Sequence, residues 1–275
     1  MPEAVRVTFR RMNFGFETVV RQHWFDDNPF LTHFFNALSA SFPEGEQFFI
    51  DSVRHYEGQV EDPVLRAQIR GFVRQEGHHT HQHRLLNDRI RARGVPLSRC
   101  DEWVGLQARR KADSPRLQLA CTCAMEHFTA LMGHWLLTQR EIVDTMDPEI
   151  AALWRWHAVE ETEHKAVAFD TYQQTGGSYR MRILGMVMAT YNFLPRVHLM
   201  QLILLQADPA PLRWSHVRDG LRVLYGKDGM VRSMLHGILR YYRRDFHPWQ
   251  HDNSALIAQW AQRDAEGALV ESAVP

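Results

Sequence analysis

Two Glu-x-x-His elements carry the clearest chemical signal in the sequence. Glu76 stands three positions before His79, and Glu161 stands three positions before His164. Residues i and i+3 lie on the same face of an α-helix, so each element sets a carboxylate beside an imidazole. Such side chains bind metal ions, although chance alone yields about one Glu-x-x-His element in a chain of this composition. Either element alone is therefore weak evidence.

Two further glutamates precede these elements at similar intervals. Glu46 lies 30 positions before Glu76, and Glu126 lies 35 positions before Glu161. In four-helix bundles, dinuclear iron or manganese sites take one glutamate from each of two helices and a Glu-x-x-His element from each of the others. Surface salt bridges, such as Glu161 with Lys165, would leave the matching halves unexplained. The predicted metal ligands are Glu46, Glu76, His79, Glu126, Glu161 and His164.

Neighbouring glutamates compete for two of these places. Glu44 could replace Glu46, and Glu160 lies beside Glu161. The apolar run after Glu46 favours an inward position for that residue, and only Glu161 repeats the i,i+3 spacing to a histidine. Glu160 is then either an additional ligand or a partner that hydrogen-bonds a ligand.

Two further histidines share the helix faces of the predicted ligands. His83 follows His79 by four positions, and His157 precedes Glu161 by four. Either could be an additional metal ligand. Either could instead be a buried histidine that supports a ligand from outside the coordination sphere, because ligating residues usually need such partners.

Cap and proline signals predict the helices that must position these residues. Asp27-Asn28-Pro29, Asp62-Pro63, Ser114-Pro115 and Asp147-Pro148 each start a helix, and Pro43 is expected to separate two helices. A short strand is expected at 5–9, and the stretch 95–113 is expected to cross between two helix pairs. The predicted helices cover about 29–40, 44–58, 62–93, 115–140, 147–175, 178–206 and 211–265, with a turn at 227–229 in the last of these ranges.

This pattern predicts an all-α fold. We expect a single domain over 1–275, made of an N-terminal segment with a short helix (1–43), a ferritin-like four-helix metal-binding bundle (44–175) and accessory C-terminal helices (176–275). Cys123, Trp154 and Trp156 have apolar neighbours at helical spacing and are interpreted as core residues.

The sequence resembles the ferritin-like di-iron carboxylate superfamily. The resemblance rests on Glu46 in FPEGEQFF, Glu76 and His79 in QEGHH, Glu126 in MEHF, and Glu161 with His164 in WHAVEETEHK. More narrowly, these phrases are similar to a bacterial family labelled "predicted metal-dependent hydrolase". The resemblance covers about residues 20 to 205, and it implies the bundle and the metal site more directly than it implies a reaction.

Four carboxylates and two imidazoles form an oxygen-rich donor set that suits iron or manganese. We expect two iron ions, with manganese or a mixed Mn/Fe pair as alternatives. The leading functional hypothesis is an oxidoreductase that uses dioxygen and an electron donor to oxidise a small organic or lipid-like substrate. A hydrolase that uses a metal-activated water is the alternative, and a non-catalytic iron-binding protein is the second alternative.

Composition limits the range of partners. The 275 residues include 32 basic and 32 acidic side chains, so no net charge attracts nucleic acid. The three cysteines show no pairing pattern, and the N-terminal segment is charged. Both features favour a cytoplasmic protein. We expect its substrate to be a small molecule. The apolar stretch 183–205 is interrupted by polar residues, so we expect it to pack on the bundle or in a homodimer. Peripheral membrane contact through 181–206 is the alternative.

Overall fold

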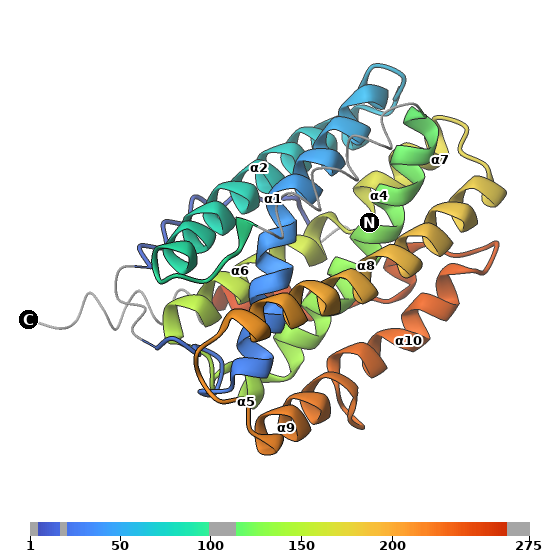
Figure 1. Ribbon diagram of the computed structural model, residues 1–275. Coiled ribbons are helices and arrows are strands. Elements are labelled where there is room, and N and C mark those ends of the chain that lie inside the picture. Colours follow the sequence, from blue (N-terminus) through green and yellow to red (C-terminus); the bar gives the residue numbers. More distant parts are fainter. Residues whose placement is uncertain (1–4, 17–20, 99–113, 263–275) are drawn as a thin grey trace, which may run out of the picture.

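Helices form the regular structure of the computed structural model, which describes residues 5–16, 21–98 and 114–262 (Figure 1). The long helices are α1 (Pro29–Glu57), α2 (Pro63–Ala92), α4 (Pro115–Thr138), α6 (Pro148–His164) and α8 (Tyr179–Ala207). The shorter ones are α5 (Arg140–Val143), α7 (Val167–Gln174), α9 (Trp214–Tyr225), α10 (Met230–Tyr241), η1 (Pro248–Gln250) and the stretch 254–262. Over these ranges the only β-type pairing is an isolated bridge between Phe25 and Met146, so the all-α prediction is confirmed.

The expected caps start two of the bundle helices. Asn28 Oδ1 accepts hydrogen bonds from the backbone N–H groups of Phe30 and Leu31, and Asp62 accepts one from Val64. Proline occupies the first turn after each cap, where its missing N–H costs no helical hydrogen bond. These local signals therefore set where α1 and α2 begin.

The packing of α1, α2, α4, α6 and α8 resembles a helical bundle. Figure 1 shows α1 and α2 side by side, with α8 running across α1 and α4. Two glycines on the contact faces allow close approach. A Cβ at Gly133 would lie 3.0 Å from the Ala158 carbonyl oxygen on α6, and one at Gly185 on α8 would lie 2.5 Å from that of Ala120 on α4. Side chains larger than hydrogen would push these helices apart.

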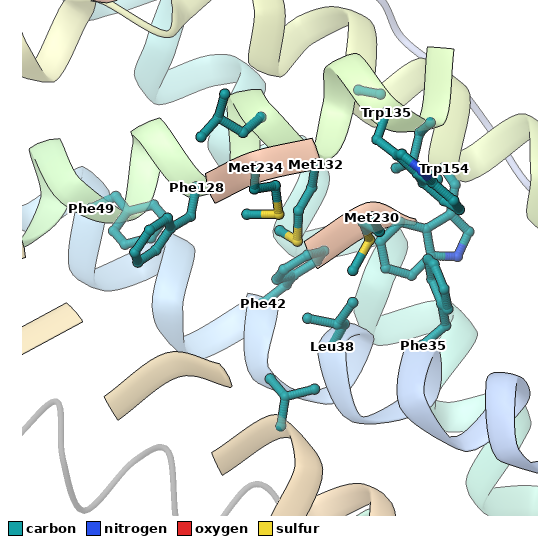
Figure 2. Close-up of a cluster of buried hydrophobic side chains, with 14 of the residues drawn as sticks. Phe35, Leu38, Phe42, Phe49, Phe128, Met132, Trp135, Trp154, Met230 and Met234 are labelled. Atoms are coloured by element: carbon teal, nitrogen blue, oxygen red, sulfur yellow. The ribbon is translucent and has the colours of Figure 1, made fainter. Parts of the chain in front are cut away.

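Aromatic and methionine side chains fill the space between the helices (Figure 2). Trp154 and Trp156 are 2% and 0% exposed, and Cys123 is 3% exposed, which confirms their prediction as core residues. The cluster in Figure 2 joins α1, α4, α6 and α10, so α10 closes one side of the core. Its labelled members are Phe35, Leu38, Phe42, Phe49, Phe128, Met132, Trp135, Trp154, Met230 and Met234.

The predicted helix boundary at Pro43 is wrong, because α1 continues through it to Glu57. A proline inside a helix leaves the carbonyl four residues earlier without its usual donor. Here that carbonyl belongs to Ser39, and the side-chain amide of Asn87 on α2 donates to it over 2.9 Å. A neighbouring helix thus supplies the missing hydrogen bond, and α1 carries Glu46 without interruption.

Two other predicted elements also differ from the structure. The helix expected over 147–175 is interrupted between α6 and α7 at Lys165 and Ala166, where Lys165 Nζ donates to the His251 carbonyl and to Asn253 Oδ1. The strand expected at 5–9 does not form. That segment instead runs without regular structure, with the Thr8 backbone bonded to side chains of α2 and α6.

The region after Pro211 contains several short helices, namely α9, α10, η1 and the stretch 254–262. The predicted turn at 227–229 separates α9 from α10. Most of the expected crossover over 95–113 lies outside the described residues. The division of the chain at 43 and 175 stays a prediction, and α1 spans the first boundary. None of the described helices combines the length and apolar character needed to cross a membrane.

Candidate metal centre

The bundle brings all six predicted ligands together. Helix α1 carries Glu46, α2 carries Glu76 and His79, α4 carries Glu126, and α6 carries Glu161 and His164. Every one of these residues is at most 4% exposed. Potential ligand atoms from Glu76, Glu126, Glu161 and His164 lie within 4.8 Å of one another, and atoms of Glu46, Glu76 and His79 form a second such group. Glu76 belongs to both groups, so the two could hold neighbouring metal ions.

His164 lies at the centre of the first group. Its Nε2 atom is 3.0 Å from Glu76 Oε1, and it is 3.4 Å from both Glu126 Oε2 and Glu161 Oε1. In the second group, His79 Nδ1 is 3.8 Å from Glu76 Oε1 and 3.7 Å from Glu161 Oε1. Carboxylate oxygens from α2, α4 and α6 thus surround Nε2 of His164, and carboxylate oxygens from α2 and α6 lie near Nδ1 of His79.

The competing glutamates take different positions. Glu46 is 2% exposed, whereas the Glu44 side chain is 46% exposed and lies 4.0 Å from Arg84 Nη2. Glu160 is buried, but its Oε2 atom lies 3.0 Å from Nε2 of His79, the nitrogen that faces away from the other carboxylates. Glu160 therefore supports His79 from outside the cluster of predicted ligands.

Hydrogen bonds to outer partners determine which nitrogen of His164 carries the proton. Gln75 Nε2 donates to Glu163 and to the Thr8 carbonyl, so Gln75 Oε1 is the atom that meets His164 Nδ1, at 2.9 Å. An amide oxygen only accepts, and His164 Nδ1 must donate to it. In the neutral ring this leaves the lone pair of Nε2 facing the glutamates, as a metal ligand requires.

A longer chain of hydrogen bonds orients His157. Because Asn87 donates through its amide to the Ser39 carbonyl, its Oδ1 accepts the Ser39 hydroxyl proton over 2.7 Å. The Ser39 oxygen then accepts from His83 Nδ1 at 2.9 Å, which leaves His83 Nε2 to accept from His157 Nδ1 at 2.8 Å. Burial lowers the pKa of His83 and keeps that ring neutral.

This chain turns the lone pair of a neutral His157 towards the carboxylates. His157 Nε2 lies 3.0 Å from Glu161 Oε1 and 3.8 Å from Glu46 Oε1. With a proton on Nδ1, His157 can offer Nε2 to a cation held between it and these two carboxylates. Of the two histidines that the sequence left open, His157 thus faces the predicted ligands, whereas His83 positions His157.

Burial dominates the electrostatics of the carboxylates. It raises the pKa of Glu76 to about 7, with repulsion from Glu161 adding to the effect, and it raises the pKa values of Glu46 and Glu126 well above their usual range. Burial acts in the same direction on Glu161, but nearby His164 outweighs it and holds the pKa of Glu161 well below normal. The same ion pair raises the pKa of His164 despite burial. Without a cation, this cluster cannot keep all four carboxylates ionised.

The residues present fit a metal cofactor. Among the described side chains, both oxygens of Glu76 and of Glu126, one oxygen of Glu46, and the inward nitrogens of His79 and His164 make no hydrogen bond of acceptable geometry. Burying such polar groups without partners costs several kcal/mol in total, on the order of 1–3 each. Metal ions bound between them would satisfy these atoms together.

The N-terminal segment and two threonines complete the surroundings, and sequence reasoning missed them. Arg10 donates to Glu163 over 2.6 Å and lies 3.5 Å from Glu160, so it holds two carboxylates that in turn support the ligand histidines. Thr80 donates to Glu46 over 2.9 Å, and Thr129 donates to Glu161. Thr80 follows Glu76 by one helical turn, a spacing that could have identified it, but no local signal links Arg10 to the site.

A second histidine cluster lies apart from this site and is satisfied without metal. His23 and His33 contact Asp208 Oδ2 through their Nε2 atoms at 2.6 and 2.7 Å. Trp24 donates to Asn36 Oδ1, so the Asn36 amide must face His33 Nδ1 as a donor, over 3.4 Å. His33 Nδ1 therefore accepts, and its Nε2 carries the proton that Asp208 accepts. This tautomer gives no lone pair to a metal.

A model of a protein family described as "Predicted metal-dependent hydrolase" matches residues 8–252 of the chain. The matched range covers the N-terminal segment around Arg10, all of the helices that carry the buried carboxylates, and α8 to α10. Searches of curated proteins and of solved structures gave no significant match.

Proposed function

The chain belongs to the family of predicted metal-dependent hydrolases, and from that premise we propose that it is a dinuclear metal enzyme with hydrolysis as the first candidate reaction. The metal ions would lie between α1, α2, α4 and α6. The seven proposed ligands are Glu46, Glu76, His79, Glu126, His157, Glu161 and His164.

The unsatisfied buried carboxylates carry this proposal. Glu76 and Glu126 are 0% and 1% exposed, and neither has a hydrogen-bond partner for either oxygen among the residues that the structure describes. A protein retains such groups when a ligand compensates for their burial. Four ionised glutamates with three neutral imidazoles balance two divalent cations, so the loaded site would have no net charge.

The donor set also supports proposals for the identity of the metal and for the superfamily of the protein. Oxygen-rich ligands with imidazoles suit iron or manganese. Structural zinc sites typically use thiolate ligands instead. One glutamate each from α1 and α4, with Glu-x-x-His elements on α2 and α6, is the ligand arrangement of ferritin-like bundles. We therefore propose ferritin-like ancestry and a di-iron, di-manganese or mixed pair.

The metal ions would supply Lewis acidity and a water of lowered pKa, which is the chemistry that hydrolysis needs. The protein side chains fix the position of the site. Gln75 and Glu160 hold the proton-bearing nitrogens of His164 and His79, and Arg10 holds Glu160 and Glu163. His79 and His164 are thereby each fixed in one orientation, which protects the site geometry against rotation of the rings.

Oxidation with dioxygen is the second candidate, and one observation favours it. The cavity next to Glu46, His157 and Glu161 is lined mainly by phenylalanine, methionine and aliphatic side chains. Such a wall excludes water, which protects a reactive oxidant but deprives hydrolysis of its co-substrate. An electron donor would be required as a partner for this reaction.

The two reactions depend differently on the metal. Water activation needs only positive charge, so zinc- or manganese-loaded protein should hydrolyse p-nitrophenyl esters or phosphoesters without oxygen and without a reductant. Oxidation needs electrons from the metal. Reduced iron-loaded protein should then consume oxygen, and zinc-loaded protein should not. Both activities should disappear in His79→Ala, and persistence of either one in this variant would exclude the site as its source.

We also propose that the protein forms a homodimer through apolar side chains exposed on α8 and α10. Tyr191 is 80% exposed and Leu239 is 69% exposed, although both lie on helices with buried faces. Light scattering should give twice the mass of the 32.2 kDa chain. A monomer that binds lipid vesicles would instead support the membrane-contact alternative.

A further inference from the structure

A cavity connects the metal centre to the surface between α1, α4, α6 and α8. Glu46, Thr129, His157 and Glu161 form its inner end. Its volume of about 130 Å³ is close to that of an engineered cavity of about 150 Å³ that holds benzene. A group of the size of a phenyl ring or a short alkyl chain therefore fits beside the proposed ligands.

The wall of this cavity is mainly apolar on α1, α4 and α8. Phenylalanines from α1, Met125 from α4, and Phe193, Val197 and Met200 from α8 line it. Apolar surface of this kind favours an apolar ligand body by about 25 cal/mol per Å² removed from water. A sugar or a nucleotide would lose hydrogen bonds to water there without replacing them.

The outer end of the cavity has a different chemistry. Asn192 and Arg196 lie one turn apart on α8, both are half-buried, and Arg196 donates to Asn192 Oδ1. Glu44 also reaches this end, but its Oε1 atom lies 4.0 Å from Arg84 Nη2. Pro195 removes one N–H from α8 at this point, so one helical hydrogen bond is missing next to the guanidinium although α8 continues. A guanidinium at the entrance of an apolar cavity can bind a carboxylate through two parallel hydrogen bonds.

We propose that the substrate is an amphiphilic monocarboxylic acid, with its carboxylate at Arg196 and its apolar body directed inwards. This inference rests on the proposed metal centre and deepens it. The polarity of the cavity orients the ligand, because the inner end already holds carboxylates and the outer end holds the arginine. The bond that reacts therefore lies at the end of the substrate remote from its carboxylate.

Calorimetric binding of octanoate and of its neutral isostere octanamide tests the role of Arg196 with the metal-loaded protein. Octanoate should bind wild type at least about tenfold more tightly than octanamide, since a charge-assisted pair is lost with the amide. Arg196→Gln should remove this difference, and Arg196→Lys should keep part of it. Arg222→Gln is the matched control, because that side chain is 73% exposed on α9. Equal binding of the two probes by wild type, or an unchanged preference in Arg196→Gln, would overturn the proposal.

Relaxation of the octanoate protons in manganese-loaded protein tests the orientation. The terminal methyl protons should relax faster than those next to the carboxylate, and the reverse order would mean that the carboxylate binds the metal. The metal content of wild type and Arg196→Gln is measured in the same samples. Failure of the metal-centre proposal appears as missing metal in wild type, whereas failure of the substrate proposal appears as normal metal content without the octanoate preference.

Discussion

His83 Nε2 lies 2.8 Å from His157 Nδ1, and this contact sets which nitrogen of His157 faces the carboxylates. The contact is the last step of a chain that starts at Asn87 and passes through the Ser39 hydroxyl. Residues that touch no proposed metal ion thus prepare a ligand for it. Helix α1 carries both Ser39 and Glu46. This series of hydrogen bonds therefore links the position of His157 to that of Glu46.

Replacing His83 should therefore weaken metal binding. In His83→Phe, nothing accepts the proton of His157 Nδ1, and the ring is free to turn its N–H towards Glu161. The metal dissociation constant should rise by roughly 10- to 100-fold, as for other residues that support ligands. Competition with a fluorescent chelator measures this change. His81→Phe changes an exposed histidine on the same helix and should leave affinity unchanged; equal affinity in both variants would contradict the assigned role of His83.

Glu126→Gln should have opposite effects on the metal-free and metal-loaded proteins. Burial raises the pKa of Glu126 well above its usual value, so the metal-free folded state binds a proton that the unfolded state has released at pH 7. The free energy of unfolding of the metal-free protein therefore falls as the pH rises above about 4.5. A glutamine at position 126 does not titrate, so the variant does not lose this free energy. Metal-free Glu126→Gln should be more stable than metal-free wild type by about 1–3 kcal/mol at pH 7.

With metal bound, the order should reverse, because the glutamine provides a weaker ligand. Urea denaturation with and without a chelator, at pH 7 and near pH 4.5, measures both effects. Glu61→Gln, at an exposed position, is the control. A metal-free Glu126→Gln protein that is less stable than wild type at pH 7 would argue against an uncompensated carboxylate at this position.

Asn87 and Pro43 should be energetically coupled. Asn87→Ala leaves the Ser39 carbonyl without a donor and should destabilise the protein by about 1–3 kcal/mol. Pro43→Ala restores a backbone N–H that can reach the same carbonyl. In that background, Asn87→Ala should cost about 1 kcal/mol less. A double-mutant cycle of unfolding free energies gives the coupling, and additive effects would show that Asn87 does not compensate for the proline.

Helical periodicity made the central part of the site predictable. Glu76 with His79 and Glu161 with His164 lie on one face at any position of a regular helix, so their direction follows from spacing alone. The apolar residues after Glu46 likewise indicated that it points inwards. What the sequence pattern predicted was a set of helix faces, and the structure brings those faces together.

Other features depend on contacts between distant segments, and local patterns do not encode them. Pro43 signals a helix break, but α1 continues through it. Asn87 on α2 donates the hydrogen bond that the Ser39 carbonyl would otherwise lack. Arg10 reaches the site only because its segment packs along α2 and α6. The interruption at Lys165 has no glycine or proline to mark it, and the Lys165 side chain binds a carbonyl and an amide of the C-terminal region.

Anomalous diffraction from crystals of protein purified without added metal tests the dinuclear centre most directly. Data collected on both sides of the iron and manganese absorption edges locate each metal and identify it. We expect two peaks, both bounded by Glu76 and Glu161, with His79 and His164 on the inner side of their helices and His157 bound through Nε2. No peak, a single peak, or peaks away from these five side chains would contradict the proposed dinuclear site.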